Sequence, residues 1–323
     1  MGRGCLAVQI EVEKYSLWRL ETEGQGNGDD CRGSAVRSVR RLFIAALALA
    51  ILAPTAFTAQ STEHAEKLKK LSLIKGKYSF IVLGDNRSGD GVYRNIIARA
   101  MERKPDFIVN VGDQIPDPGD GDDWDRFWEL SKPITVPYFL TVGNHDVNSR
   151  KSEQIYQEQV DLPGNELYYR FRVGTASLFI VLDSYLTGEQ KKITGDQYQW
   201  LKNTMNGAPE HIFVFLHHPL YGNKEQGSHY GRSVDQYPAE RDRLQELFST
   251  HGVDGVFAGH EHMYHRQKEG VVTHIITGGA GAPLYAKDED GGFYHFIHVT
   301  VDGEKVSGEV VDSKGKVRDR FAL

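Results

Sequence analysis

The sequence predicts an α/β fold in which two β-sheets are flanked by helices. From Tyr78 onward, short apolar runs alternate with amphipathic segments, a rhythm typical of parallel strands joined by helices. Beyond Val253 the chain carries β-branched runs separated by turn residues, so we expect the domain to close in strands. With 323 residues, of which 40% are hydrophobic, the chain can bury a sizeable core.

The individual elements follow from the spacing of apolar residues. Residues 80–83 form an unbroken apolar run typical of a buried strand, and Val92, Ile96 and Ala100 then fall on one face of a helix. The other expected strands are residues 107–111, 138–142, 168–173, 178–182, 212–216, 253–258, 271–277, 293–301 and 305–311. The other expected helices are residues 123–132, 195–205 and 240–249. Residues 221–236 form a long polar loop, of the kind that often covers functional sites.

Residues 36–59 have the layout of a secretory signal peptide. Arg40 and Arg41 precede the apolar run 42–53, and small residues follow it up to Ala59. The run is shorter than the roughly 20 residues of a membrane-spanning helix. We therefore expect cleavage and export to the periplasm or the extracellular space. An uncleaved segment would instead anchor the protein in the membrane.

Two further segments surround the expected signal peptide. Residues 1–35 lack periodicity and are rich in Gly, Glu and Asp, so they are either a disordered extension or precede the true start of translation. Residues 60–76 are polar and basic, which indicates a linker or a first surface helix. Residues 77–323 are expected to form the folded domain.

Composition narrows the class of function. The formal net charge is −6, which argues against a general nucleic-acid-binding protein, because such proteins need a basic face. Both cysteines, Cys5 and Cys31, precede the apolar run, so the exported part can fold in an oxidising compartment without disulfides. All 13 histidines lie after that run.

Side chains that can bind metal ions follow several of the expected strands directly. Because the carboxyl ends of strands in an α/β sheet share one edge, we expect these side chains to converge. Each motif alone is commonly a turn or a packed histidine, but their occurrence in this order leaves little room for chance. The motifs are Gly84-Asp85-Asn86-Arg87, Gly112-Asp113, Gly143-Asn144-His145-Asp146, His217-His218-Pro219 and Gly259-His260-Glu261-His262.

This ordered set of motifs resembles the calcineurin-like metallophosphoesterase superfamily, which includes purple acid phosphatases and cyclic-nucleotide phosphodiesterases. The resemblance extends over about residues 78–312 and implies an αβ-sandwich of two mixed β-sheets flanked by helices. It also implies two transition-metal ions. Asp113 would bridge them, with Asn144, His217 and His260 completing one site and Asp85 and His262 holding the other ion.

The same resemblance assigns roles beside the metal ions. His145 would lie next to the leaving group, and Asp146 would orient its ring. His217 is the expected ligand in the third motif, since the family places a proline two residues later, as Pro219 is here, and His218 is the alternative.

The chemistry of phosphate-ester hydrolysis independently favours these residue types. The reaction needs a strong nucleophile and positive charge near the phosphoryl oxygens, and two divalent ions about 3.5–4 Å apart supply both. Carboxylate and imidazole ligands suit Fe, Mn or Zn, and the lack of thiolates argues against a structural zinc site. A histidine can protonate the departing oxygen.

Arg87 departs from the family pattern. Most members have Asp-x-His in the first motif, and purple acid phosphatases use a Tyr three residues after the bridging Asp instead; here Arg87 and Pro116 occupy those positions. Three interpretations are open. Arg87 binds substrate phosphate as a planar fork of donors, or the first metal site is weak and rich in water, or Arg87 pairs with a carboxylate such as Asp90.

We therefore expect an exported phosphoesterase that hydrolyses phosphate mono- or diesters by in-line attack of a metal-bridging hydroxide. Its partner would be a small phosphorylated substrate, contacted by Arg87 and, from the polar loop, by His229. One alternative, motivated by Arg87, is an exported protein that binds metal or phosphate without turnover. Another is a site altered for phosphonate or pyrophosphate bonds. No nucleic-acid-binding surface is evident, and a membrane is a partner only if the signal segment stays attached.

Overall fold

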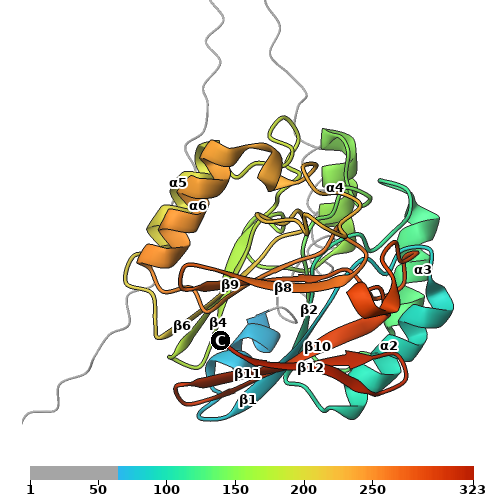
Figure 1. Ribbon diagram of the computed structural model, residues 1–323, viewed down its shortest axis with the longest axis horizontal. Coiled ribbons are helices and arrows are strands. Elements are labelled where there is room, and N and C mark those ends of the chain that lie inside the picture. Colours follow the sequence, from blue (N-terminus) through green and yellow to red (C-terminus); the bar gives the residue numbers. More distant parts are fainter. Residues whose placement is uncertain (1–64) are drawn as a thin grey trace, which may run out of the picture. The chain divides into compact units, whose positions relative to one another are not determined.

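The computed structural model describes residues 65–323 (Figure 1). The expected signal peptide, the extension before it and the first residues of the expected linker lie outside the described residues. Residues 65–72 are helical, and Leu71 at the end of this helix is only 2% exposed. This segment therefore packs on the domain as a first helix.

Two mixed sheets of six strands each form the centre of the fold. Sheet A has the strand order β12-β11-β10-β1-β2-β3 and sheet B the order β4-β5-β6-β7-β9-β8. The strands of sheet A are β1 (Tyr78–Leu83), β2 (Phe107–Asn110), β3 (Tyr138–Leu140), β10 (His295–Asp302), β11 (Lys305–Asp312) and β12 (Val317–Ala322). Those of sheet B are β4 (Tyr169–Val173), β5 (Ser177–Val181), β6 (His211–Phe215), β7 (Gly255–Ala258), β8 (Tyr264–Glu269) and β9 (Val272–Thr277).

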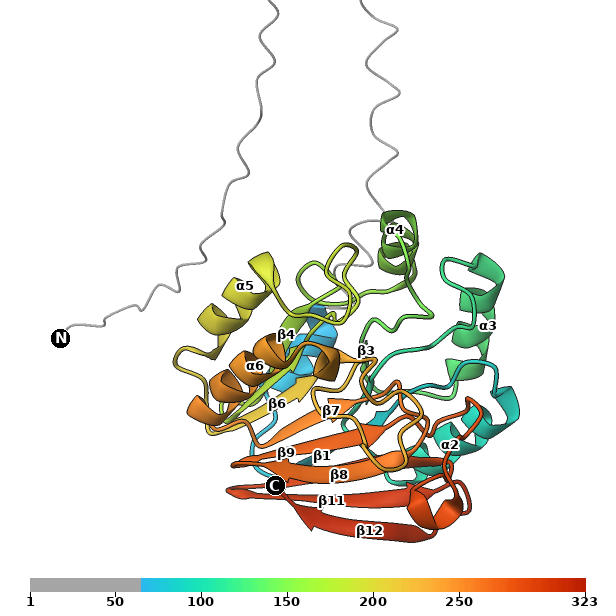
Figure 2. The same cartoon turned by 45° about the horizontal axis from the view of Figure 1, so that its top comes forward.

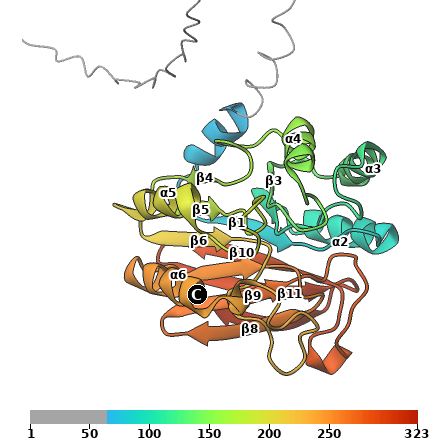
Figure 3. The same ribbon diagram turned by 90° about the horizontal axis from the view of Figure 1, so that it is seen from above.

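Helices flank both sheets. They are α2 (Asp90–Glu102), α3 (Gly121–Ser131), α4 (Arg150–Gln159), α5 (Gly195–Met205) and α6 (Pro238–Thr250). Figure 2 shows α2 and α3 on the opposite side of the sandwich from α5 and α6. The helix at residues 65–72 lies beside β4 (Figure 3), where the Leu71 carbonyl accepts a hydrogen bond from Gly174 N at 3.0 Å.

Phenylalanine rings fill the space between the sheets. Phe80 and Phe107 from sheet A meet Phe179 from sheet B edge to face, with ring centroids 5.2 and 5.1 Å apart. Such edge-to-face pairs add about 0.5–1.5 kcal/mol each to the stabilisation from burial alone. A second cluster, on the outer face of sheet B, packs Leu201 of α5 and Leu244 and Phe248 of α6. Both sheets are therefore rigid supports for the loops at their ends.

The α/β fold with two mixed sheets and outer helices is confirmed. Every strand and helix expected from the apolar pattern is present, with ends shifted by a few residues at most. The apolar pattern does not predict α4, β8 and β12, in which at least half of the residues are polar or charged. Across residues 65–323, none of the helices combines the length and the apolar character that crossing a membrane requires.

Candidate metal centre

Parallel strands from both sheets end at the candidate site. In sheet A the final paired residues of β1, β2 and β3 are level with one another, and in sheet B Phe215 of β6 pairs with Phe257 of β7. The backbone amide of His260 donates to the two carboxylate oxygens of Asp85 at 3.1 and 3.0 Å. This contact joins the edge of sheet B to the edge of sheet A, so the strand-end motifs converge.

Several residues at this junction adopt a backbone conformation that is uncommon for side chains larger than glycine. The φ angles of Asp85, Asp113 and His260 are 57°, 57° and 69°. Non-glycine residues with positive φ persist where the surroundings hold them in place, and they cluster at functional sites. Here the tight turns aim the three side chains at one another.

Glycines allow the motif loops to touch. A side chain at Gly143 would collide with the backbone nitrogen of Asp113, and one at Gly259 would collide with the Asp85 carboxylate. Only glycine fits such a close approach of backbone to a neighbouring group. Glycine is thus required at positions 143 and 259, directly before the expected ligands Asn144 and His260, because the loops pack closely against each other there.

The potential ligand atoms lie close together and are buried. One ligand atom each from Asp85, Asp113 and His217 lie within 4.8 Å of one another. His217 Nε2 is 3.3 Å from Asp113 Oδ1 and 3.2 Å from Asn144 Oδ1. Burial opposes ionisation of Asp85, but the hydrogen bond with His262 and nearby positive charge outweigh it and lower its pKa. The Asp85 carboxylate is therefore ready to bind a cation.

Backbone carbonyls select which ring nitrogen faces the site. His217 Nδ1 donates to the Val111 carbonyl at 2.9 Å, and His262 Nδ1 donates to the Pro283 carbonyl at 2.7 Å. A carbonyl can only accept, so in the neutral rings Nε2 carries the lone pair. Each Nε2 nevertheless faces a carboxylate oxygen, at 3.3 Å for His217 and 3.5 Å for His262. A protonated His262 can donate to Asp85, and this contact raises the pKa of the ring although burial opposes it. A metal ion bound between each Nε2 and its carboxylate would satisfy the same atoms.

A second group of imidazoles adjoins the first. His217, His218 and His260 also place one ligand atom each within 4.8 Å of one another. Burial first, and then the neighbouring histidines, hold the pKa of His218 and of His260 well below the ordinary value, so both rings stay neutral. His218 Nε2 is buried and has no hydrogen-bond partner among the described residues. Carboxylates, neutral imidazoles and an amide oxygen form a donor set that fits Zn, Fe or Mn.

Asp146 does not orient the His145 ring, which corrects the expectation drawn from the family pattern. His145 Nδ1 donates instead to the Pro116 carbonyl at 2.7 Å. The fully buried Asp146 carboxylate accepts hydrogen bonds at 2.7–3.2 Å from four backbone amides, those of Asp113, Gln114, Ile115 and Gly143. Asp146 therefore holds the loop that carries Asp113 in place. Only a carboxylate, whose two oxygens both accept hydrogen bonds, can satisfy all four donors in this buried position.

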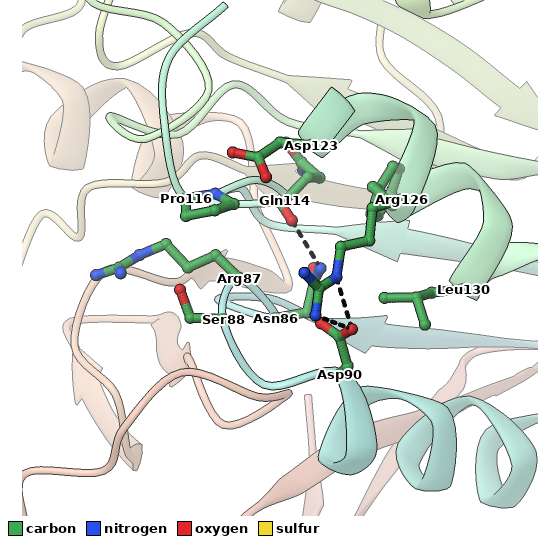
Figure 4. A pocket seen from close by; sticks show the side chains of 10 residues that line it. Asn86, Arg87, Ser88, Asp90, Gln114, Pro116, Asp123, Arg126 and Leu130 are labelled. Carbon is green, nitrogen blue, oxygen red and sulfur yellow. Dashed lines mark hydrogen bonds and ion pairs between the residues drawn. The ribbon is translucent and has the colours of Figure 1, made fainter. Parts of the chain in front are cut away.

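Arg87 pairs with Asp113, the carboxylate that the family resemblance expects to bridge the ions. Its Nε lies 3.1 Å from Asp113 Oδ2, and its side chain is 17% exposed. The suggested partner Asp90 is bound to Arg126 Nε at 2.7 Å. Figure 4 shows Arg87 pointing away from the Asp90–Arg126 pair. Arg87 therefore pairs with a carboxylate, as the third interpretation expects, but that carboxylate is Asp113 and not Asp90. Its guanidinium lies at the metal centre.

The polar loop brings His229 to the same place. The His229 ring lies 4.5 Å from His260 and 6.2 Å from His262, centroid to centroid. Its backbone amide donates to Glu261 Oε2 at 3.1 Å. Burial raises the pKa of Glu261 to about 7. Glu261, between two expected metal ligands, thus anchors the loop above the centre.

A buried network of amides lies behind the loops, and the strand-end motifs do not predict it. Asn110 Nδ2 donates to Asn86 Oδ1 at 2.8 Å, Asn86 Nδ2 donates to the Gln114 carbonyl at 3.0 Å, and Gln114 Nε2 donates to Asn110 Oδ1 at 3.2 Å. These bonds tie the loop after β1 to the loop after β2. A feature of the sequence that points to this network is Asn110, a polar residue at the end of an otherwise apolar strand.

Asp183, at the end of β5, gives a pH-dependent stability. Burial raises its pKa from 3.8 to about 8, although Tyr185 N donates to its Oδ1 at 2.7 Å. The folded state thus holds a proton that the unfolded chain releases, so this contribution to stability is lost as pH rises from about 4 to about 8.

Asp183→Asn should reduce the fall in Tm between pH 5 and pH 8, measured by circular dichroism. An equal fall in both proteins would contradict this, and exposed Asp302→Asn is the control.

The sequence matches a described family and several named proteins. A family-wide profile of calcineurin-like phosphoesterases matches residues 66–264. Purple acid phosphatase 23 of Arabidopsis thaliana is 30% identical over 215 residues, which cover 62% of this chain and 42% of that protein. Tartrate-resistant acid phosphatase type 5 of Mus musculus is 27% identical over 214 residues, which cover 56% of this chain and 63% of that protein.

A solved structure shows the same fold. Purple acid phosphatase PPD1 from yellow lupin seeds superimposes with a TM-score of 0.64 and 19% identity, over 77% of this chain and 54% of that one. The fold and the site at the strand ends both agree with the class of protein that the profile describes. The chain belongs to the calcineurin-like phosphoesterase family. It spans less than half the length of the first plant purple acid phosphatases that it matches.

Proposed function

We propose that this protein hydrolyses phosphate esters at a centre of two metal ions. The observation that carries the proposal is the convergence of buried carboxylates with the lone-pair nitrogens of fixed imidazoles at the strand ends. Family membership and the purple acid phosphatase relatives support it. No feature within residues 65–323 favours a binding protein without turnover.

The residues divide between two ions around a shared carboxylate. Asp113 would contact both ions; Asn144, His217 and His260 would hold one, and Asp85 and His262 the other. His218 adds a neutral nitrogen on the side of His217 and His260. When bound, such a pair of ions supplies Lewis-acid polarisation and neutralises charge on the phosphoryl group. The donor set suits Zn, Fe or Mn.

Arg87 and His145 act on the substrate itself. Nε of Arg87 is engaged by Asp113, which leaves the two terminal nitrogens to bind phosphoryl oxygens as a planar fork. The Pro116 carbonyl accepts a hydrogen bond from Nδ1–H of His145, so Nε2 is the atom that can hold and deliver a proton to the leaving oxygen. His229 lies above the same centre and would contact the substrate from the polar loop.

Hydrolysis assays with the purified protein test this function. We expect metal-dependent cleavage of 4-nitrophenyl phosphate, bis(4-nitrophenyl) phosphate or both, which a chelator abolishes and which added Zn, Mn or Fe restores. No cleavage of either ester with any of these metals would overturn the proposal. The ratio of the two rates would assign the protein to monoesterases or diesterases.

Arg87→Ala is expected to lower kcat/KM for phosphate esters about 10–100-fold, because a charge-assisted hydrogen bond to the phosphoryl group is lost. Most of the loss should appear in KM when the metal content is unchanged. Arg87→His would restore the usual family ligand, so it should tighten binding of the first metal in a titration. Unchanged kcat/KM in Arg87→Ala would rule out phosphate binding by this residue.

We also propose that the protein is exported, since basic residues followed by the apolar run 42–53 form a secretory signal. N-terminal sequencing of the protein isolated from cells should find a start near residue 60. A mature protein that retains Met1 would contradict cleavage. Retention in the membrane fraction would instead support an uncleaved anchor.

A further inference from the structure

A cavity of about 250 Å³ adjoins the metal centre (Figure 4). It lies between the loop after β1 and the loop that leads from β2 into α3. Arg87 borders one end, and the Asp90–Arg126 pair borders the other. At about 30 Å³ per water molecule, the cavity holds about eight waters, enough for one small organic group.

The cavity lies next to residues that are expected to act on the substrate. Pro116 forms part of its wall, and the Pro116 carbonyl holds the ring of His145, the expected proton donor. Arg87, the expected phosphate ligand, forms the wall nearest Asp113. A phosphoryl group held between Arg87 and the metal centre, with its ester substituent directed past Pro116, would place that substituent in this cavity.

Beside the donors of Arg87, Ser88 and Arg126, the cavity has several acceptor atoms that no donor occupies. Gln114 is 2% exposed, and its Oε1 has no hydrogen-bond partner among the described residues. Asp90 makes its contacts with Arg126 through Oδ2, and Asp123 accepts from Asp117 N through Oδ2 at 3.3 Å. Within residues 65–323, the Oδ1 atoms of both carboxylates are left for another donor. Phe127 adds an apolar surface to the wall.

The charges around the cavity are unevenly compensated. Arg87 is paired with Asp113, and Arg126 is paired with Asp90. Asp123 has no ion-pair partner within the described part of the chain. A leaving group with a second phosphate or a carboxylate would face this charge, and like charges repel. A neutral group rich in hydroxyls would instead donate to Asp90, Gln114 and Asp123.

We propose that this cavity is the leaving-group subsite and that it selects phosphomonoesters of neutral polyhydroxylated alcohols, such as a single sugar. The inference rests on the proposed function. In the reaction, water supplies the new oxygen on phosphorus, the bond between phosphorus and the sugar oxygen breaks, and that oxygen takes a proton from His145. The products are the free sugar and inorganic phosphate. Phe127 would pack against the C–H face of the ring.

The full-length holoenzyme tests the subsite with three named substrates. Glucose 6-phosphate offers hydroxyls, glucose 1,6-bisphosphate adds a second anion, and 4-nitrophenyl phosphate offers neither. We expect Asp123→Ala to lower kcat/KM for glucose 6-phosphate about tenfold, as for loss of a hydrogen bond to a charged group, and to change the value for 4-nitrophenyl phosphate less than about twofold. Asp123→Asn, which keeps the shape and the bond from Asp117 N, should raise the ratio of bisphosphate to monophosphate hydrolysis.

Asp125→Ala is the matched control, because Asp125 is exposed on the same helix and does not line the cavity. It should leave all three substrates unchanged. Equal effects of Asp123→Ala on glucose 6-phosphate and 4-nitrophenyl phosphate, with metal content intact, would overturn the subsite while leaving the phosphoesterase activity established. Absence of hydrolysis of all three substrates by the wild-type holoenzyme would overturn both proposals.

Discussion

Asp113→Asn is expected to lower kcat/KM for phosphate esters by at least about 1,000-fold. Replacing residues that only support metal ligands typically costs 10–100-fold, and Asp113 is placed to touch both ions itself. Its carboxylate is 1% exposed and is approached by Arg87, His217 and the His145 amide. An amide would carry no charge and could not bridge two cations, so metal content should fall together with activity. Steady-state kinetics and elemental analysis of the same sample measure both.

Asp117→Asn is the control for this prediction. Asp117 follows in the same loop but is exposed and lies outside the group of ligand atoms. Its replacement should leave kinetics and metal content within about twofold of wild type, as expected for a surface residue. An Asp113→Asn protein that keeps its metals and most of its activity would show that the reaction does not depend on a shared carboxylate.

His145→Ala has the second-largest expected effect, and its size should depend on the leaving group. General acid catalysis contributes about 100–10,000-fold, and it matters most when the departing oxygen is a poor leaving group. Hydrolysis of an alkyl ester such as glucose 6-phosphate should therefore fall by that factor. Hydrolysis of 4-nitrophenyl phosphate should fall much less, because a phenolate of this kind leaves without a proton. Comparison of the two kcat values measures the difference.

His251→Ala is the matched control, since His251 caps α6 through the Leu247 carbonyl and lies outside the clusters of ligand atoms. It should affect neither substrate. A His145→Ala protein that loses the same factor with both esters would contradict the role of proton donor. It would favour a purely structural role through Pro116.

The buried strands could be predicted because both faces of each are covered. Apolar runs such as FIV within β2 and IFVF within β6 are typical of strands inside a sandwich. The edge strands β8 and β12 lack this signal, since their sequences YHRQKE and VRDRFA are largely charged. Charged edges protect a sheet from pairing with other chains, so they carry little apolar periodicity. Helix α4 has only Ile155 and Tyr156 as apolar residues and is recognisable by its Ser149 cap.

The location of the site could be predicted, but the contacts inside it could not. Strand topology alone brings Asp85, Asp113 and Asn144 to one edge, because parallel strands share their carboxyl ends. Which carboxylate holds Arg87, and which acceptor holds the His145 ring, depends on loop conformations with positive φ that sequence spacing does not encode. Asp146 illustrates this, since its backbone partners come from two separate loops.

The contact between the edges of sheets A and B also explains why the site can tolerate Arg87 in place of the usual histidine. The sheets share a core of phenylalanine rings, and loops from both meet at the Asp85–His260 contact. A centre supported in this way can keep its ligand atoms in place when one position differs from the family pattern. We expect the site that contains Asp85 and His262 to bind its ion more weakly than the site that contains Asn144, His217 and His260.

The central claim is tested most directly by a titration with Zn or Mn of protein from which a chelator has removed the metal. The metal content of the protein and its hydrolysis of 4-nitrophenyl phosphate are measured at each step. The account predicts binding of two ions per chain in steps of unequal affinity, with hydrolysis appearing as the second site fills. Fewer than one ion per chain, together with no hydrolysis that depends on metal, would contradict it.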